Sequence, residues 1–541
     1  MGEMTGAGNA TPVTTDAKEK DAKAVIYKIP DRVIPVVFLP GVMGSNLLGA
    51  DSKSLWRLDS SVGAAWDWAV KGAEDRKRLL HYKRTSVDDG GKISEASQRE
   101  QMLFLSRKKR KWGEAGFISY GEFLPWIQYA LNDHDEMYSN KLTKNGKLTQ
   151  RENLIDYNLN AELGEVNLTA DEIALSYKYL FPVHGAGYNW LASNADSANE
   201  LNNRITEIIN DYNSRGIKCE KVILVTHSMG GFVARYFSEN LNYSNKILGI
   251  VHGVMPTLGS PAAYRRMKAG EPSTAGMVLG NTGAKMTAVL AQSPGPLELL
   301  PGKSYHSGWL KIEGMQDGLP KSGNPFSDIY KERSAWWALC EDRFLNPEDK
   351  RKDKSKIDLG WDAYTLLIDK VERVINKLDG KFHKNTYVFY GCGGKDSDKK
   401  YREDYLSYTN IYWKGVAHGK YDRNVGKDLS VLAYKGILAD MYMEEIEGSR
   451  TVVLATDLNK ENWLKREYII SPPESSGDGT VPVEAAKFTD EGLKGMLGVE
   501  VSHEGAYKKK GDNPTDHARL FTLRSIIKIA QEVNNTTLAY K

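Results

Sequence analysis

Apolar runs alternate with amphipathic stretches along much of the chain, a pattern typical of a parallel sheet covered by helices. Short runs rich in Val, Ile, Leu and aromatic residues predict buried strands at 32–41, 178–183, 221–226, 246–255 and 385–394. Residues 197–216 predict an amphipathic helix, with Ser197 and Glu200 as its capping box and Gly216 at its end. Strands alternating with helices predict an α/β fold whose mostly parallel sheet is flanked by helices.

Three longer segments interrupt this rhythm, at about 50–175, 261–383 and 396–466. They are rich in Lys, Asp, Asn and Trp, and nothing in them resembles a linker between independent halves. The chain has 541 residues, more than one domain usually needs. We therefore expect one domain over 25–541 with large insertions, preceded by a flexible polar tail at 1–24.

Composition mainly excludes classes of function. The net charge of +3 is small for this length, which argues against bulk nucleic-acid binding. No apolar run approaches the roughly 18 residues that a membrane-spanning helix needs, and the first residues lack the apolar core of a signal peptide. The three cysteines are far apart, show no metal-ligand spacing and are too few for a disulfide framework, so we expect reduced thiols. No cluster of metal ligands is visible in the sequence, and no cofactor is expected.

The segment "LVTHSMGG" (224–231) predicts a nucleophile elbow, in which a serine occupies a sharp turn between a strand and a helix. Ser228 follows the predicted strand 221–226, and two glycines and an apolar helical stretch follow it. The pattern departs from Gly-x-Ser-x-Gly at Thr226, which is bulkier than glycine. His227 adjoins the serine in the turn, so we expect it to point away and not to serve as the base.

The general base and its acidic partner are expected after Ser228, in the order acid and then histidine. His503 follows a short strand-like run amid small residues, whereas His517 begins a stretch that indicates a packing helix, so His503 is the favoured base. Asp478 in "SSGDGTVPVEAA" is the favoured acid, because it lies in a glycine-flanked turn before His503. Asp396, at the end of another predicted strand, is the competing acid.

An ester-cleaving serine also needs backbone N–H groups to stabilise the oxyanion. One is expected from Met229, the residue after the serine, and one from the loop "FLPGVMGSNL" (38–47), whose glycines permit close approach. Val42 is the predicted second donor, with Met43 as the alternative.

Two apolar segments bear on how a lipid would reach such a site. Residues 275–302 are broken by glycines and rich in Met, Val and Leu, which favours a mobile lid that can present these apolar side chains to lipid; the alternative is a rigid loop on the core. Residues 107–131 join five consecutive basic residues to an aromatic-rich helical stretch. Burial of that helix is favoured over an interfacial anchor, because apolar residues surround it on nearly every side.

The order of "LPGVMGSNL", "GYNW", "THSMGG", "SGDGTVP" and "SHEGAY" resembles that in serine esterases related to lecithin–cholesterol acyltransferase, which have the α/β-hydrolase fold. The segments "FPVHGAGYNWLASNADSA" and "MPTLGSPAAYRRMKAG" are similar to those of antibacterial phospholipase effectors of type VI secretion systems. The resemblance covers about half of the chain and leaves most of the inserted segments unexplained.

The resemblance implies a serine hydrolase with Ser228 as nucleophile, Asp478 as acid, His503 as base, and Val42 and Met229 as the oxyanion hole. It also implies hydrolysis of acyl esters in membrane phospholipids and transient membrane contact. An effector of this kind would be made in the bacterial cytoplasm and delivered without a signal peptide to the periplasm of a target cell. Its partners would be a cognate immunity protein and a secretion-spike protein. The alternatives are a lipid acyltransferase, a general carboxylesterase, or a binding module on a hydrolase scaffold.

Overall fold

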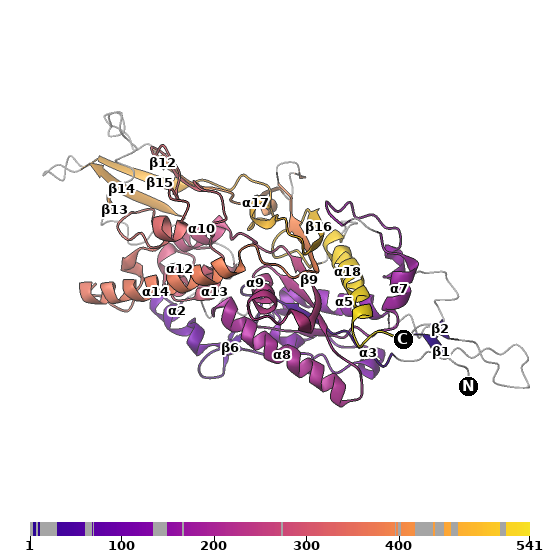
Figure 1. Ribbon diagram of the computed structural model, residues 1–541. Coiled ribbons are helices and arrows are strands. Elements are labelled where there is room, and N and C mark those ends of the chain that lie inside the picture. The colour runs from indigo at the N-terminus through magenta and orange to yellow at the C-terminus, as the bar shows by residue number, and fades with distance from the viewer. Residues whose placement is uncertain are drawn as a thin grey trace, which may run out of the picture.

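The computed structural model describes most of the chain, and its central sheet lies between helices while a second sheet stands apart (Figure 1). The described residues are 4–6, 9–10, 30–59, 68, 70–133, 149–164, 167–271, 274–394, 397–398, 402–416, 437–438, 448–455, 464–508 and 516–540. The short strands β1 (Met4–Gly6) and β2 (Asn9–Ala10) pair with each other in antiparallel fashion.

The central sheet has six strands in the order β16-β11-β9-β8-β3-β7, and every neighbouring pair is parallel. The strands are β3 (Val36–Leu39), β7 (Val183–Gly185), β8 (Val222–His227), β9 (Ile247–Gly253), β11 (Thr386–Gly391) and β16 (Leu493–Val499). The first five correspond to the five predicted strands, and the sixth is the run before His503. The predicted α/β-hydrolase arrangement of a parallel sheet flanked by helices is therefore confirmed.

The second predicted strand begins later than its apolar run suggested. The backbone of Leu180 already pairs with the chain ahead of β3, since its N–H donates to Arg32 O and its carbonyl accepts from Ile34 N. Pro182 has no N–H and cannot continue such a ladder, so β7 starts at Val183.

Helices cover both faces of the central sheet. On one face, α8 (Asn194–Ser214) packs on α9 (Gly230–Arg235), and α9 contacts β3, β8 and β9. On the other face, α18 (His517–Ala530) lies across β8, β9, β11 and β16 beside α5 (Phe123–Asn132) and α7 (Ala170–Ser176). Alternate strand residues feed the two sides, with Val37 and Leu39 in one apolar cluster and Val36 and Phe38 in the other.

The start of α8 differs from the prediction. Ser193, not Ser197, caps the helix by accepting a hydrogen bond from Ala195 N. The carboxylate of Glu298 accepts hydrogen bonds from the Ser193 hydroxyl at 2.6 Å and from Asn194 N at 2.8 Å. Because this carboxylate satisfies N–H and O–H groups at the helix start, the helix extends one turn beyond the predicted cap.

Two of the three predicted insertions meet in a second sheet. Its strand order is β10-β12-β15-β14-β13, with β10 and β12 parallel and the other pairs antiparallel. The strands are β10 (Leu310–Ile312), β12 (Ile411–Val416), β13 (Ile437–Leu438), β14 (Ser449–Ala455) and β15 (Leu464–Ile470). The chain therefore leaves the central sheet after β11, builds most of this second sheet, and returns to the central sheet before β16.

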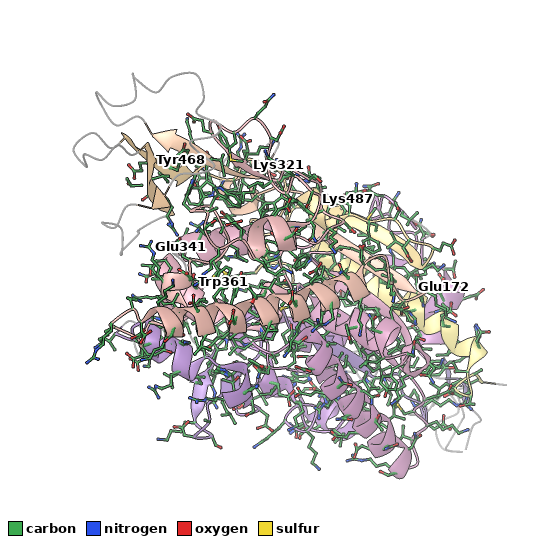
Figure 2. The ribbon with its side chains drawn as sticks, turned by 60° about the vertical axis from the view of Figure 1, so that its left-hand side comes forward. Glu172, Lys321, Glu341, Trp361, Tyr468 and Lys487 are labelled. Atoms are coloured by element: carbon green, nitrogen blue, oxygen red, sulfur yellow. The ribbon has the colours of Figure 1, made fainter. Side chains whose placement is uncertain are left out.

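The remaining elements are short apart from one long helix, α14 (Lys354–Leu378), which contains Trp361, labelled in Figure 2. A small antiparallel sheet joins β4 (Leu47–Leu48), β5 (Ser54–Trp56) and β6 (Ser86–Val87). The other helices are α2 (Ala73–Leu79), α3 (Gln98–Leu103), α4 (Phe117–Tyr120), α10 (Pro261–Ala269), α11 (Thr274–Leu279), α12 (Gly283–Leu290), α13 (Pro294–Leu297), α15 (Arg402–Tyr405) and α17 (Val483–Ala486). Within the described ranges, none of the helices combines the length and the apolar character that crossing a bilayer requires.

Candidate active site

Ser228 occupies a strained turn at the carboxyl end of β8. Its φ is +51°, a left-handed conformation that is uncommon for residues other than glycine, and α9 begins two residues later. The Ser228 N–H donates to Gly253 O at the end of β9, which fixes the turn against the neighbouring strand. A Cβ on Gly230 would lie 2.6 Å from Pro40 O, so the glycine allows α9 to approach the chain after β3. The local geometry is that of a nucleophile elbow.

The imidazole of His503 lies between Ser228 and Asp478. Its Nε2 is 2.8 Å from Ser228 Oγ and its Nδ1 is 2.8 Å from Asp478 Oδ2. A carboxylate accepts hydrogen bonds, so Nδ1 carries the hydrogen and Nε2 is left to accept from the serine hydroxyl. His503 therefore has the tautomer that removal of a proton from Ser228 requires.

Asp478 is buried at the end of β11, where a side chain on Gly391 would overlap it. Its Oδ1 accepts hydrogen bonds from Thr480 N at 2.9 Å and Val481 N at 2.7 Å, which leaves Oδ2 for His503. The Asp478 carbonyl also accepts the His503 N–H at 2.7 Å, so the two loops are joined through backbone and side chain. The competing acid, Asp396, lies outside the described residues, and His517 is the first residue of α18.

The loop after β3 forms a tight turn over Ser228. Gly44 N donates to Gly41 O at 2.9 Å, and Met43 has a φ of +62°. This hydrogen bond uses neither the Val42 nor the Met43 N–H, and neither group has a backbone hydrogen-bond partner among the described residues. Met229 precedes the first turn of α9, where backbone N–H groups lack partners within the helix. The predicted donors Val42 and Met229 thus belong to the two segments that flank the serine.

His227 points away from the serine hydroxyl, as expected for its neighbour in the turn. Its Nδ1 lies 2.9 Å from the Tyr120 hydroxyl, and its Nε2 lies 2.8 Å from the His503 carbonyl oxygen. Burial, with a smaller effect from His503, lowers the pKa of His227 to about 3. The imidazole is therefore neutral at physiological pH. Sequence reasoning missed Tyr120, since no local pattern singles out "FISYGEF".

Thr226, the departure from the glycine pattern, has a hydrogen-bond partner of its own. Its hydroxyl lies 2.9 Å from Nδ1 of His252, its register neighbour on β9, and its carbonyl accepts from the Tyr507 hydroxyl at 3.1 Å. Tyr507 lies four residues after His503 and packs its ring on Phe123. The threonine therefore links the elbow to β9 and to the loop that carries His503.

The segment 275–302, expected to form a lid, contains apolar side chains that are buried in this structure. Met286 is 1 % exposed and Val289 is fully buried. Their helix, α12, packs between α2 and α10, so their partners come from two other parts of the chain. In this structure the two side chains pack on the core, and a lid that moves to present them to lipid stays a prediction.

The basic run 107–111 divides between surface and core. Arg107 and Arg110 are buried and both bind the carboxylate of Glu100, each at 2.5 Å, whereas Lys108 and Lys109 are exposed. The helix that follows buries Phe123 and Leu124. The favoured interpretation of a buried helix is confirmed, although two of the basic residues are not solvated. No cluster of three or more metal-ligating side chains occurs in the part of the chain that the structure describes.

Comparison with known proteins agrees with this geometry. A family model described as Lecithin:cholesterol acyltransferase matches residues 176–517, which include Ser228, Asp478 and His503. The solved complex of Tle4 with Tli4 contains a chain that is 26 % identical, with a TM-score of 0.69; the match covers 92 % of this chain and 98 % of that one. No curated protein matches the sequence. The family match and the likeness to Tle4 confirm the resemblance drawn from the sequence motifs.

Proposed function

The chain belongs to the lecithin:cholesterol acyltransferase family of serine ester hydrolases, and we propose that it hydrolyses the acyl esters of membrane phospholipids. The observation that carries this proposal is the pair of 2.8 Å hydrogen bonds from Ser228 through His503 to Asp478 at a nucleophile elbow. A serine with a positive φ, a neutral acceptor nitrogen on its hydroxyl and a buried carboxylate behind that imidazole is the arrangement used for acyl transfer.

In the proposed mechanism, Nε2 of His503 takes the Ser228 proton while Oγ attacks the ester carbonyl. The negative charge that develops on the carbonyl oxygen is stabilised by the N–H groups of Val42 and Met229. The imidazolium returns its proton to the leaving alcohol, which for a phospholipid is a lysolipid. Water activated by His503 then cleaves the acyl-enzyme.

Asp478 is assigned to hold His503 and to stabilise its charged form. This role is supported by the hydrogen bonds of its two oxygens, since one accepts from two backbone N–H groups and the other from the imidazole. A carboxylate restrained in this way keeps Nδ1 protonated throughout the reaction.

The test is fatty-acid release from phosphatidylethanolamine/phosphatidylglycerol vesicles, comparing the protein with Ser228→Ala. We expect release by the protein and none above background by the variant. Equal release from both would remove Ser228 from the mechanism. Failure of the protein to release fatty acid or to cleave short-chain esters would favour a binding module on a hydrolase scaffold.

Acyl transfer is a second candidate, because the matching family model is named for an acyltransferase. Transfer and hydrolysis share the acyl-enzyme and differ in whether an alcohol or water accepts the acyl group. Including a long-chain alcohol in the same vesicles separates them. Ester formation that rises with the alcohol as free fatty acid falls would establish transfer.

The likeness to Tle4 in its complex with Tli4 supports an antibacterial effector role, with a cognate immunity protein and a secretion-spike protein as partners. In this role the protein would be made in the bacterial cytoplasm, delivered to the periplasm of a target cell, and would contact membrane only transiently. Expression with an added export signal should harm a bacterium without the immunity protein. Survival equal to that of cells exporting Ser228→Ala would contradict the effector role and leave the esterase intact.

A further inference from the structure

The hydroxyl of Tyr120 joins the turn after β3 to the nucleophile elbow. Gly41 N–H donates to it at 3.0 Å, and Nδ1 of His227 lies 2.9 Å from it on the other side. Tyr120 and His227 are 3 % and 6 % exposed. Nε2 of His227 continues the chain to the carbonyl oxygen of His503, at 2.8 Å. Three hydrogen bonds thus connect the loop that contains Val42 to the loop that contains His503.

The direction of each hydrogen bond follows from the groups involved. The His503 carbonyl can only accept, so Nε2 of His227 carries a hydrogen. Burial keeps this imidazole neutral, with its pKa lowered to about 3, so Nδ1 has no hydrogen and accepts from the Tyr120 hydroxyl. The phenol oxygen in turn accepts from Gly41 N. Every donor and acceptor in the chain is used once, and no alternative direction satisfies all four groups.

This arrangement determines which N–H groups remain for a substrate. Since Tyr120 takes the Gly41 N–H, the Val42 and Met43 N–H groups are the next along the turn. The turn also lies directly against the elbow: a Cβ on Gly41 would be 2.6 Å from Nδ1 of His227 and 3.2 Å from Cβ of Ser228. A small displacement of the turn would therefore change the distance between these N–H groups and an oxyanion formed at Ser228.

The segment that carries Tyr120 is itself tied to the same turn. Gly116 N donates to Gly44 O at 2.8 Å, and Ala115 pairs with Ser45 in an antiparallel bridge. The Tyr120 ring packs edge-on against Phe38 of β3, with 4.8 Å between ring centroids. The insertion 50–175 therefore supports the turn through its backbone and supplies the hydroxyl that fixes Gly41.

We propose that Tyr120 and His227 are positioning residues, which hold the Val42 turn and the His503 loop at a fixed separation around Ser228. The inference rests on the esterase function proposed above. Neither residue touches the substrate; Tyr120 acts through the oxyanion turn and His227 through the backbone of the base. Loss of either should lower kcat more than it raises KM, because the transition state, not the bound ester, requires the alignment.

The first test is Tyr120→Phe, which removes the hydroxyl and keeps the ring against Phe38. We expect kcat on a soluble short-chain ester to fall about 10- to 100-fold, less than the roughly 10²- to 10³-fold loss for removal of an oxyanion donor. KM should change by less than about threefold. The rate at which a fluorophosphonate labels Ser228 should fall in parallel. Tyr330→Phe is the matched control, since it removes a hydroxyl that is likewise buried and donates to Pro301 O, away from the elbow.

Two amides at position 227 separate the two contacts of His227. Asparagine puts an acceptor near the place of Nδ1, so His227→Asn retains the bond with Tyr120 and loses the one to His503. Glutamine reaches the place of Nε2, so His227→Gln retains a donor for the His503 carbonyl. We expect both to slow turnover. His227→Asn should affect the fluorophosphonate rate more, because the carbonyl of His503 then loses its hydrogen bond from position 227.

The outcomes distinguish this inference from the function on which it rests. If the protein is active, Ser228→Ala is inactive, and both Tyr120→Phe and His227→Asn keep kcat within twofold of the protein, the positioning role is overturned while the esterase remains. If the protein neither cleaves esters nor reacts with the fluorophosphonate, both proposals fail. Should Tyr120→Phe melt far below Tyr330→Phe, the two variants at position 227 decide the question.

Discussion

Two buried groups of polar side chains differ in how completely their hydrogen bonds are used. At the carboxyl ends of the central strands, Ser228, His503 and Asp478 form a line of two hydrogen bonds that ends at the serine hydroxyl. Val42 and Met229, the proposed oxyanion donors, lie in the two segments that flank this serine. Beside the second sheet, Glu341 (labelled in Figure 2) is enclosed by cations. The first group ends at a hydroxyl that can react with a bound molecule. In the second group the charged side chains bind one another.

The charged group joins three distant segments. Glu341 Oε1 accepts from Lys268 Nζ and from Arg450 Nε, both at 2.8 Å, and Oε2 accepts from Arg343 at 2.7 Å. Burial by itself would raise the pKa of Glu341, but the charges of Arg450, Lys268 and Arg343 outweigh it and hold the pKa well below the usual value. This group fastens β14 to α10. The comparison predicts that changes to the first group reduce activity and changes to the second reduce stability.

Asp478→Asn should have the largest effect, a fall in kcat of about 10⁴-fold with little change in melting temperature. The asparagine oxygen can still accept from Thr480 N and Val481 N, so the loop keeps its support. Its NH₂ group would face Nδ1 of His503 and favour the tautomer that cannot accept the Ser228 proton. Steady-state kinetics and thermal unfolding measure the two quantities. A loss of less than tenfold would remove Asp478 from the mechanism and favour Asp396 as the acid.

Glu341→Gln should show the opposite pattern. It leaves the buried charges of Lys268 and Arg450 without their counter-charge, so we expect the free energy of unfolding to fall by about 3–5 kcal/mol. Below the melting temperature kcat should stay within about threefold. Urea denaturation gives the first value. Asp75→Asn is the control, because its ion pair with Arg78 is exposed and should contribute less than about 1 kcal/mol. Equal destabilisation by the two variants would contradict the comparison.

The elbow and its partners could be predicted because their signals are local or ordered along the chain. The apolar run before Ser228 and the two glycines after it indicate a strand, a tight turn and a helix. His503 and Asp478 are marked by their order and by small flanking residues, and the structure places His503 against Ser228 and Asp478 against His503. Local sequence therefore located Ser228 and His503, which follow β8 and β16 of the central sheet, and Asp478, which lies in the turn region after β15.

The contacts that sequence reasoning missed join segments without a shared pattern. Tyr120 is 107 positions from His227, and nothing around it distinguishes a tyrosine that reaches the elbow from one that fills the core. The burial of Met286 could not be predicted for a related reason. An apolar stretch broken by glycines looks the same whether it faces lipid or packs against α2 and α10, because only the tertiary structure supplies those partners.

Acid should destabilise the protein through two buried histidines next to the nucleophile elbow, His227 and His252. Burial lowers the pKa of His227 and of His252 to about 3, whereas an unfolded histidine titrates near 6.5. Between these values the unfolded chain binds more protons, so their stabilising contribution is complete above about pH 6.5 and is lost as the pH falls toward 3. Glu114 and Glu298, whose pKa burial raises to about 7, act in the opposite direction over part of this range.

The difference between the protein and His252→Asn isolates one histidine from these opposing groups. Asparagine can keep the bond to Thr226 and does not titrate. From pH 6.5 to 4.5 the protein should lose about 2–3 kcal/mol more than the variant, from about 1.4 kcal/mol per pH unit. Urea midpoints at several pH values provide the measurement. Parallel curves for the two proteins would show that His252 titrates normally in the folded state.

Thr226→Val should have the smallest effect. It tests whether a buried hydroxyl next to the elbow affects only stability or also activity. Valine matches the shape of threonine but removes the hydroxyl from Nδ1 of His252, whose Nε2 is already buried without a partner among the described residues. We expect a loss of about 1–2 kcal/mol in the free energy of unfolding, with kcat within about threefold. Denaturation and ester turnover measure these values. A fall in kcat of tenfold or more would mean that the hydroxyl also sets the geometry of Ser228, and that Thr226 belongs functionally with the residues that position the elbow.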